Sequence, residues 1–254
     1  MMILALVRNY MTAHYQVING KWQVADIAKD SWDVENKVIG TIGAGRIGQR
    51  VLERLIAFKP SKLLYSDYAQ LPKAREQELQ AEYVSMEDLV KQCDVITINC
   101  PLHKETEGMF NKRLFDMMKP RGFLVNTARG KIVDREAVKE ALESGHLQGY
   151  AGDVWYPQPA PEDHPWRHMP RQAMTPHYSG TTLDAQQRYA AGTKEVLRRF
   201  FSKEELNPTD VIVSGGKMAA QYDSSVNAEG RSLEFKEEWE KINKPSGPAS
   251  GAAS

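Results

Sequence analysis

The sequence has 254 residues, which is enough to bury one large core or two modest ones. Lys and Arg together number 33, and Asp and Glu together also number 33, so the formal charge is zero. This balance gives none of the basic surface that nucleic-acid-binding or anionic-membrane-binding proteins use, and we expect neither kind of partner.

The first ten residues, MMILALVRNY, fit no targeting segment. No basic region precedes their apolar run, and Arg8 interrupts it early, as a signal peptide would not allow. The run is also far too short to span a membrane. It predicts an amphipathic core helix that begins without a capping residue or a preceding turn, which suggests that sequence is missing before it.

From Lys37 onward, apolar strands alternate with helices. The predicted strands are apolar throughout, as in a parallel sheet that helices cover on both faces. The two cysteines, Cys93 and Cys100, lie in or beside one predicted strand and could not bridge each other along it, which favours reduced thiols. We predict strands at Val38–Ile42, Lys62–Ser66, Asp94–Asn99 and Gly122–Asn126, with further strand ends at Tyr150–Val154 and Ala173–Pro176. Helices are expected from the end of GAGRIG to about Phe58, in the Glu- and Gln-rich stretch after Asp67, at Asp134–Ser144 and at Asp184–Phe201.

The segment GAGRIG between the first strand and its helix is typical of a dinucleotide-binding turn. Gly43 would permit the tight turn, Gly45 the close approach of a pyrophosphate, and Gly48 close packing of helix on strand. The pyrophosphate would then lie on the unpaired N–H groups of the helix N-terminus. Asp67 follows Gly48 by 19 positions and would bind the adenosine ribose, which favours NAD over NADP. We therefore predict an α/β fold of the Rossmann type, with a doubly wound parallel sheet.

Polar or special residues recur where the other predicted strands end. In such a sheet the ligand lies outside the carboxyl ends of the strands, so these residues are candidates for one site. They are Asn99, Cys100 and Pro101 with His103, then Thr127, Ala128 and Arg129, then Gly152 and Asp153, and finally His177.

Four longer segments carry a family likeness. NCPLHKET, LVNTARG, GYAGDVWYPQPAPEDHPWR and MTPHYSGTTLDAQQRYAAGT resemble D-specific 2-hydroxy acid dehydrogenases, and in particular their NAD-dependent formate dehydrogenase branch. The likeness covers roughly residues 1 to 220. It implies oxidation of formate to carbon dioxide by hydride transfer to NAD.

The resemblance also implies a catalytic trio. In the wider family an arginine holds the substrate carboxylate, a histidine moves the hydroxyl proton, and a glutamate keeps that histidine protonated. The matching residues here are Arg129, His177 and Gln158. Gln158 departs from the family's glutamate. Because formate has no hydroxyl proton to lose, an amide that orients the imidazole without tuning it suits this substrate.

The same resemblance implies where the cofactor contacts lie. Arg46 and Ile47 would lie along the pyrophosphate, with Gly43, Gly45 and Gly48. The adenosine side would be lined by Asp67, Asn99, Pro101 and His103. The nicotinamide end would be approached by Thr127, Ala128, Arg129, Asp153, His177, Ser179 and Gly180.

We expect no metal site. His164 and His168 are four residues apart, a spacing that suits metal ligands on a helix. Pro161 and Pro165 make a regular helix there unfavourable, however, so this spacing does not predict a zinc site.

The predicted organisation has four parts. Residues 1–35 form a linking helix and loop, 36–180 the NAD-binding domain, 181–214 a helix that returns to the substrate domain, and 215–254 a disordered tail. The resemblance implies that most of the substrate domain precedes this sequence, and that the helix at Asp184–Phe201 therefore exposes an apolar face.

The resemblance further implies a homodimer with formate as its small-molecule substrate. We expect a cytoplasmic location, or a mitochondrial one if a preceding segment carried a transit peptide. A non-catalytic NAD-binding fragment or module is the alternative reading of the chain.

Overall fold

The computed structural model describes residues 1–218, and these fall into two compact units. The first unit is Met1–Pro176, and the second begins at His177. The first unit is built on one sheet, whereas the second contains a long helix and a short hairpin.

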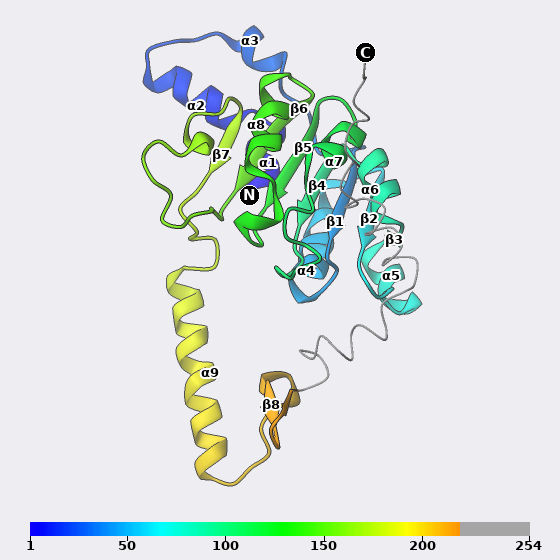
Figure 1. Cartoon of the computed structure of the whole chain (residues 1–254), viewed down its shortest axis with the longest axis vertical. Coiled ribbons are helices and arrows are strands. Elements are labelled where there is room, and N and C mark those ends of the chain that lie inside the picture. The colour runs from blue at the N-terminus through cyan, green and yellow to red at the C-terminus, as the bar shows by residue number, and fades with distance from the viewer. Residues whose placement is uncertain (219–254) are drawn as a thin grey trace, which may run out of the picture. The chain divides into compact units, whose positions relative to one another are not determined.

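The sheet of the first unit has seven strands in the order β3-β2-β1-β4-β5-β6-β7, and every pair is parallel (Figure 1). The order runs in opposite directions on the two sides of β1, which is the doubly wound arrangement that the sequence predicted. The strands are β1 Val38–Ile42, β2 Lys62–Ser66, β3 Ala81–Tyr83, β4 Val95–Ile98, β5 Gly122–Asn126, β6 Leu147–Gly152 and β7 Gln172–Met174.

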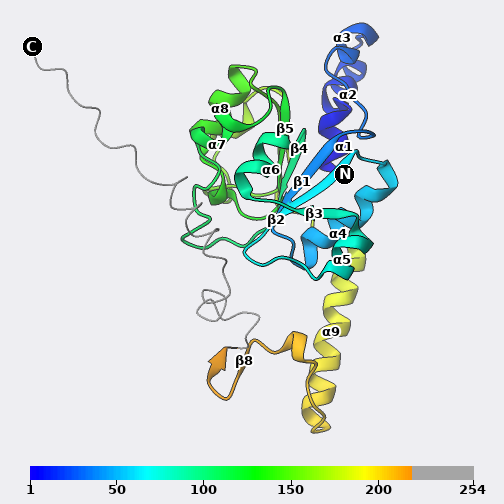
Figure 2. The same ribbon diagram turned by 90° about the vertical axis from the view of Figure 1, so that its right-hand side faces the viewer.

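Helices cover both faces of this sheet (Figure 2). One face is covered by α6, α7 and α8, and the other by α1, α4 and α5. The helices of the first unit are α1 Met2–Val7, α2 Tyr10–Ile18, α3 Val24–Ala28, α4 Arg46–Leu55, α5 Lys73–Leu79, α6 Met86–Gln92, α7 Lys112–Met117 and α8 Arg135–Glu143.

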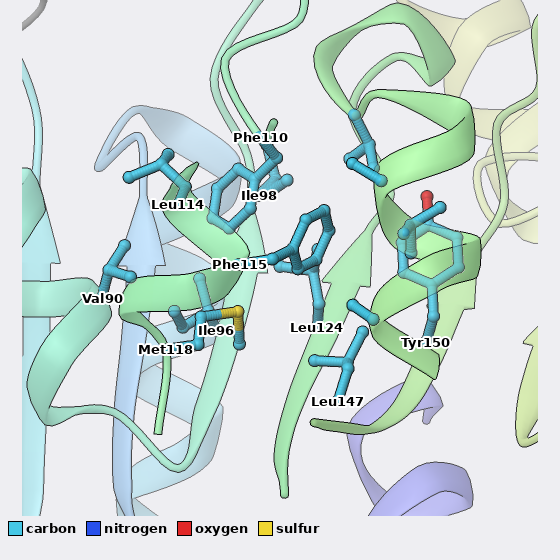
Figure 3. Packing of buried hydrophobic residues seen from close by; sticks show 14 of the residues in the cluster. Val90, Ile96, Ile98, Phe110, Leu114, Phe115, Met118, Leu124, Leu147 and Tyr150 are labelled. Atoms are coloured by element: carbon cyan, nitrogen blue, oxygen red, sulfur yellow. The ribbon is translucent and has the colours of Figure 1, made fainter. Parts of the chain in front are cut away.

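Each strand supplies both faces, because successive side chains point to opposite sides of a sheet. Leu64 thus packs in the layer beneath α6 and α7, whereas its neighbours Leu63 and Tyr65 pack in the layer beneath α1 and α4. Figure 3 shows the first of these layers, where Phe110 and Phe115 meet edge to face with their ring centroids 5.8 Å apart. Burial on both faces explains why the strands are apolar throughout.

Side chains cap several helix N-termini and fix where the helices begin. Asp134 accepts a hydrogen bond from the backbone N–H of Ala137 at 2.8 Å and is the N-cap residue of α8, which therefore begins one residue after the predicted start. Ser85 and Asn111 cap α6 and α7 in the same way. Gly145, which follows α8 with a φ of +77°, is the expected left-handed residue past the helix end.

The opening helix is shorter than the sequence predicted. Met2–Val7 packs its apolar side chains on the sheet, as expected for a core helix, but the helix ends at Val7. Asn9 has a φ of 51°, in the left-handed region, and the chain then begins a separate helix, Tyr10–Ile18, that buries none of its residues. An interrupted pair of helices therefore replaces the single helix expected over the first ten residues.

Strands β1, β2 and β5 have the predicted bounds, but three other strands differ. Strand β7 is Gln172–Met174, one residue earlier than the predicted start and two earlier than the predicted end. Strand β4 is Val95–Ile98, one residue shorter at each end than predicted, although the backbone N–H groups of Asp94 and Asn99 still donate to carbonyl oxygens of β1. Strand β6 is Leu147–Gly152, three residues earlier than the predicted start and two earlier than the predicted end.

The second unit contains α9, which is Leu183–Phe201 and matches the predicted helix to within one residue. Ala185 is the one buried residue of α9, and Tyr189, Phe200 and Phe201 are exposed. A short ladder pairs β8, Val213–Ser214, at the end of the predicted segment 181–214, with β9, Lys217–Met218, in the first residues of the predicted tail. The rest of that tail lies outside the described residues, and the four-part division of the chain stays a prediction. No helix within residues 1–218 is long and apolar enough to cross a membrane.

Candidate functional site

The candidate site lies at the edge of the sheet where the parallel strands end. The strands β1, β2, β4, β5 and β6 are neighbours with matched registers, so the residues that follow them emerge side by side. This placement brings the following predicted residues of the first unit to one edge: Gly43, Gly45, Gly48, Asp67, Asn99, Thr127, Ala128, Arg129 and Asp153.

The turn after β1 requires glycine at two positions. Gly43 has a φ of +90°, and a Cβ atom there would lie 2.6 Å from the backbone nitrogen of Cys100. A Cβ atom on Gly48, in the first turn of α4, would collide with the carbonyl oxygen of Gly43. Both glycines therefore let α4 start directly against the strand ends, as the motif predicts.

We expect Gly43→Ala to destabilise the fold by about 2 to 3 kcal/mol, because it combines a left-handed φ with a backbone collision. Gly145→Ala is the matched control, since Gly145 also has a positive φ but a Cβ atom there would find open space. It should cost about 1 kcal/mol. The measurement is the free energy of unfolding in denaturant; equal losses in the two variants would show that the collision contributes nothing.

The first turn of α4 is open to solvent. Gly45 is the N-cap residue of α4, no side chain caps the helix, and a Cβ atom on Gly45 would meet nothing within 4 Å. Arg46 and Ile47 are exposed beside it, with Ile47 66% exposed. Unpaired N–H groups at a helix N-terminus bind anions, and the space above Gly45 would admit a pyrophosphate.

Asp67 lies immediately after β2 and faces this turn. Its carboxylate accepts hydrogen bonds from the N–H groups of Ala44, at 2.6 Å, and Tyr68, at 2.7 Å. Burial raises the pKa of Asp67 above its ordinary value, and these backbone donors offset only part of that effect. A half-buried carboxylate beside the glycine turn is suited to accept the hydroxyl groups of a ribose and to repel a 2′-phosphate.

If Asp67 binds the ribose, as the sequence predicts, its raised pKa gives an expected dependence of NAD affinity on pH. Ribose hydroxyl groups would donate to the charged carboxylate, so bound NAD favours the ionised form. We therefore expect the affinity to stay constant near neutrality and to fall as the pH drops through the raised pKa of Asp67. Titrations of NAD between about pH 4.5 and pH 8 test this, with Asp67→Asn as the control. Asp67→Asn should bind NAD weakly at every pH. If the affinity for NAD changes equally with pH in both proteins, Asp67 is not the group responsible.

Asn99 follows β4 and is tied to the strand ends. Its amide Nδ2 donates to the hydroxyl oxygen of Thr41 at 2.8 Å, whereas its buried Oδ1 has no hydrogen-bond partner among residues 1–218. A buried amide oxygen without a donor is costly, and a ligand hydroxyl at this edge would satisfy it. Pro101 and His103 are exposed in the next loop, which Thr106 holds by accepting from the N–H of His103 at 2.8 Å.

The two cysteines are free, as the sequence predicted. Burial raises the pKa of Cys93 to about 12. Burial and the nearby charge of Asp67 raise the pKa of Cys100 to about 12. Both thiols therefore stay protonated near neutral pH and are not nucleophiles in this structure.

The loop after β5 presents Arg129 on a fixed backbone. The buried side chain of Asn126 accepts from the N–H of Ala128 at 3.0 Å and donates to the carbonyl oxygen of Arg129 at 2.9 Å. A Cβ atom on Gly130 would lie 2.5 Å from backbone atoms of Trp155, so this loop also packs against the loop after β6. The guanidinium group of Arg129 remains exposed and donates to the carbonyl oxygen of Ala128 at 2.7 Å.

Asp153 is buried directly after β6. Its Oδ1 accepts a hydrogen bond from the hydroxyl of Thr175 at 2.5 Å. Trp155 donates its indole N–H to the carbonyl oxygen of the same Thr175 at 2.7 Å. The loops after β6 and β7 are thus joined at Thr175, which fixes the direction of the Asp153 carboxylate.

Gln158 lies on the exposed loop that follows Trp155. His164 closes this loop with its Nε2 3.0 Å from the carbonyl oxygen of Tyr156, and its Nδ1 accepts from the N–H of Trp166. Arg167 donates to the carbonyl oxygen of Pro161 at 2.8 Å. Both ring nitrogens of His164 are therefore used in holding the loop, which leaves neither for a metal, and no metal-binding cluster occurs within residues 1–218.

His177, Ser179 and Gly180 fall in the second unit, which begins at His177. All three residues are exposed, and His177 has a φ of 58°, which places its backbone in the left-handed region. Their predicted roles at the nicotinamide end stay predictions.

Several residues that shape the site were not singled out from the sequence. Asn126 bonds backbone groups of its own loop, Trp155 donates to the carbonyl oxygen of Thr175, and the Thr175 hydroxyl donates to the Asp153 carboxylate. Ala44 acts through its own N–H group. The position of Asn126 at a strand end was a usable signal. The indole of Trp155 and the hydroxyl of Thr175 gave none, because their partners lie about twenty residues away or more in the chain.

Taken together, the edge fits a dinucleotide. Gly45 leaves open space over an uncapped helix, Asp67 offers a carboxylate beside it, and the buried Oδ1 of Asn99 needs a donor. The family model of the D-isomer specific 2-hydroxyacid dehydrogenase NAD binding domain matches residues 1–179. The chain belongs to this family, and NAD is the cofactor of its domain.

Individual relatives and solved structures give a more specific comparison. The chain is 56% identical over 224 residues to the formate dehydrogenase of Candida boidinii, a match that covers 85% of this chain and 62% of the relative. A Granulicella formate dehydrogenase structure is similar with a TM-score of 0.81 and 49% identity, over 86% of this chain and 58% of that one. The NAD-dependent formate dehydrogenase of Staphylococcus aureus in complex with NAD is similar with a TM-score of 0.74 and 49% identity, over 84% and 62%. The chain thus spans about three fifths of the length of these relatives.

Proposed function

We propose that this chain is the cofactor-binding part of an NAD-dependent formate dehydrogenase. In the reaction, the hydride of formate is transferred to NAD, which becomes NADH, and the remaining atoms leave as carbon dioxide. No hydroxyl proton is removed, so the chain needs groups that bind and orient an anion more than it needs an acid or a base.

The observation that carries this proposal is the placement of Arg129. Its guanidinium group is exposed at the carboxyl edge of the sheet, on a backbone that Asn126 holds from both sides. A rigid arginine at this edge can bind a carboxylate with two parallel charge-assisted hydrogen bonds. Arg129 would hold the formate oxygens so that the C–H bond points toward the nicotinamide ring, which supplies the hydride acceptor when NAD is bound.

Gln158 supports formate over a 2-hydroxy acid as the substrate. A glutamate at this position would raise the pKa of a neighbouring histidine, whereas a neutral amide can only orient it. We propose that Gln158 orients His177, which helps to hold formate beside Arg129. Asp153, fixed by Thr175, would accept a hydrogen bond from the carboxamide of NAD and set the face of the ring that receives the hydride.

The experiment compares substrates. NADH formation is measured with the purified chain and NAD, using formate in one series and D-lactate as the 2-hydroxy acid in the other, with NAD binding titrated in parallel. We expect turnover with formate alone. Turnover of D-lactate would overturn the substrate assignment, and NAD binding without any turnover would identify the chain as a non-catalytic NAD-binding module.

Gln158→Glu should make formate turnover depend on pH. A charged glutamate would favour the protonated imidazole of a neighbouring histidine, an effect that a neutral amide does not have, so kcat/KM should vary with pH more in the variant than in the unaltered protein. The pH profile of kcat/KM for formate, taken for both proteins, is the measurement. Superimposable profiles would contradict the role of Gln158.

We also propose that the protein is a homodimer in which α2 contributes to the contact. Its side chains support this, because Tyr15 is 66% exposed and Ile18 is 64% exposed. The mass of the protein in solution tests the proposal, and a monomer would contradict it.

We propose a cytoplasmic location, with the mitochondrion as the alternative because the name of a relative from Solanum tuberosum places that protein there.

A further inference from the structure

The loop at residues 67–72 joins β2 to α5 and begins with the carboxylate assigned to the ribose (Figure 1). Its first residue is fixed from two directions. The hydroxyl of Tyr83 donates to the carbonyl oxygen of Asp67 at 3.4 Å, and the N–H of Tyr68 donates to the Asp67 carboxylate. The position of Asp67 therefore depends on the conformation of the loop that follows it.

The far end of the loop is held by one buried phenol. Tyr65, on β2, is fully buried, and its hydroxyl accepts a hydrogen bond from the N–H of Leu71 at 2.8 Å. The same hydroxyl donates to Oε1 of Glu76, on α5, at 2.6 Å. Gln70 donates to that oxygen as well, at 2.8 Å. Strand, loop and helix thus meet at a single hydroxyl and a single carboxylate.

Glu76 is an ionised carboxylate at a buried position. Its residue is 7% exposed, and Lys73 donates to Oε2 at 2.7 Å. The ion pair with Lys73 and the hydrogen bonds from Tyr65 and Gln70 lower the pKa of Glu76 to about 2. Burial and the charge of Glu76 raise the pKa of Tyr65, so its hydroxyl stays a neutral donor. The network therefore favours the charged form of Glu76, and this one carboxylate is bonded to Lys73, Tyr65 and Gln70 at the same time.

The loop has little other support on its outer side. A solvent-open hollow of about 510 Å³ lies beside α5 and β3 and is lined by the loop residue Gln70 together with Lys73, Glu76 and Tyr83. On its inner side, Leu71 packs against the apolar layer beneath α1 and α4. The hydrogen bonds to the N–H of Leu71 and from Gln70 add the polar contacts that hold this end of the loop.

We propose that Tyr65 and Glu76 are positioning residues that hold the loop at 67–72 so that Asp67 discriminates between NAD and NADP. Tyr65 is fully buried and Glu76 nearly so, which suits a role that acts through Asp67. When the network is broken, Asp67 can turn away from the ribose, so NAD loses a hydrogen-bond acceptor while NADP loses a repulsive charge. The inference rests on the proposed role of Asp67 in binding NAD, and it does not depend on formate oxidation.

The test uses Tyr65→Phe in the full 254-residue chain. This variant keeps the ring and removes the bridging hydroxyl. Dissociation constants for NAD and NADP are measured by titration at neutral pH. We expect the Kd for NAD to rise about fivefold and the ratio of Kd for NADP to Kd for NAD to fall at least about threefold. Glu76→Gln keeps an acceptor for Tyr65 and should give a smaller change in the ratio.

Val95→Ala is the control for stability. Val95 is fully buried on β4, away from the loop, so this variant should lower the melting temperature and leave the ratio unchanged. If Tyr65→Phe weakens NAD and NADP equally, or weakens neither, the positioning role is wrong. If the unaltered chain fails to bind NAD, the cofactor assignment itself fails, which is a separate result.

Discussion

Gly45→Val should abolish tight NAD binding and leave the fold intact. The φ of Gly45 is −70°, which valine adopts readily, and a Cβ atom there meets nothing within 4 Å. The free protein therefore has room for the side chain, and we expect a cost of no more than about 1 kcal/mol, the effect of a poorer N-cap residue. Bound pyrophosphate would occupy the same space, so the Kd for NAD should rise at least about 100-fold, or about 2.7 kcal/mol.

The measurements for Gly45→Val are NAD titration and denaturant unfolding of the same samples. Ser85→Ala is the matched control, because it removes the side-chain cap of α6 and should cost about 1 kcal/mol without affecting NAD. Tight NAD binding by Gly45→Val would mean that the pyrophosphate does not lie on the N-terminus of α4.

Arg129→Ala should lower kcat/KM for formate by about 100-fold or more, the size of effect seen when a charged or polar group that stabilises a transition state is removed. The backbone of Arg129 is held by Asn126, so the substitution removes the guanidinium group without releasing the loop. Arg129→Lys keeps the charge but loses the two parallel donors. Its kcat/KM for formate should lie between the values for the unaltered protein and for Arg129→Ala.

Steady-state kinetics with varied formate give the effect of Arg129→Ala, and NAD titration gives the effect on the cofactor, which should be far smaller. Arg113→Ala is the control for loss of one positive charge, because Arg113 pairs with Glu87 on the face covered by α6 and α7. If kcat/KM for formate falls by less than about threefold in Arg129→Ala, Arg129 does not bind formate.

The parts of the fold that the sequence predicted are those with strong local signals. Strands β1, β2 and β5 are mostly apolar and have the predicted bounds, and the turn after β1 has the glycine geometry that the motif predicts. Strand β3 was missed because it has three residues, one of them Glu82 on an exposed edge. Helix α7 was missed as well, since its six residues are too few for an apolar period to stand out.

The scaffold of the site could not be predicted, for a different physical reason. The hydroxyl of Thr175 donates to the carboxylate of Asp153, which lies 22 positions earlier in the sequence. The hydroxyl of Tyr65 accepts from the N–H of Leu71, but the strand pattern predicts only that Tyr65 is buried. Such hydrogen bonds depend on how loops meet in three dimensions, and no spacing in the chain encodes them. The break at Asn9 is similar, because only packing of Met2–Val7 on the sheet shows where that helix must end.

We infer that the carboxyl edge of this sheet binds NAD through the turn after β1 and through Asp67. The decisive experiment is titration of the purified chain with NAD and with NADP at neutral pH. We expect saturable binding of NAD and binding of NADP that is at least about tenfold weaker, because the charge of Asp67 opposes a 2′-phosphate. Equal binding of the two dinucleotides, or no binding of NAD, would contradict it.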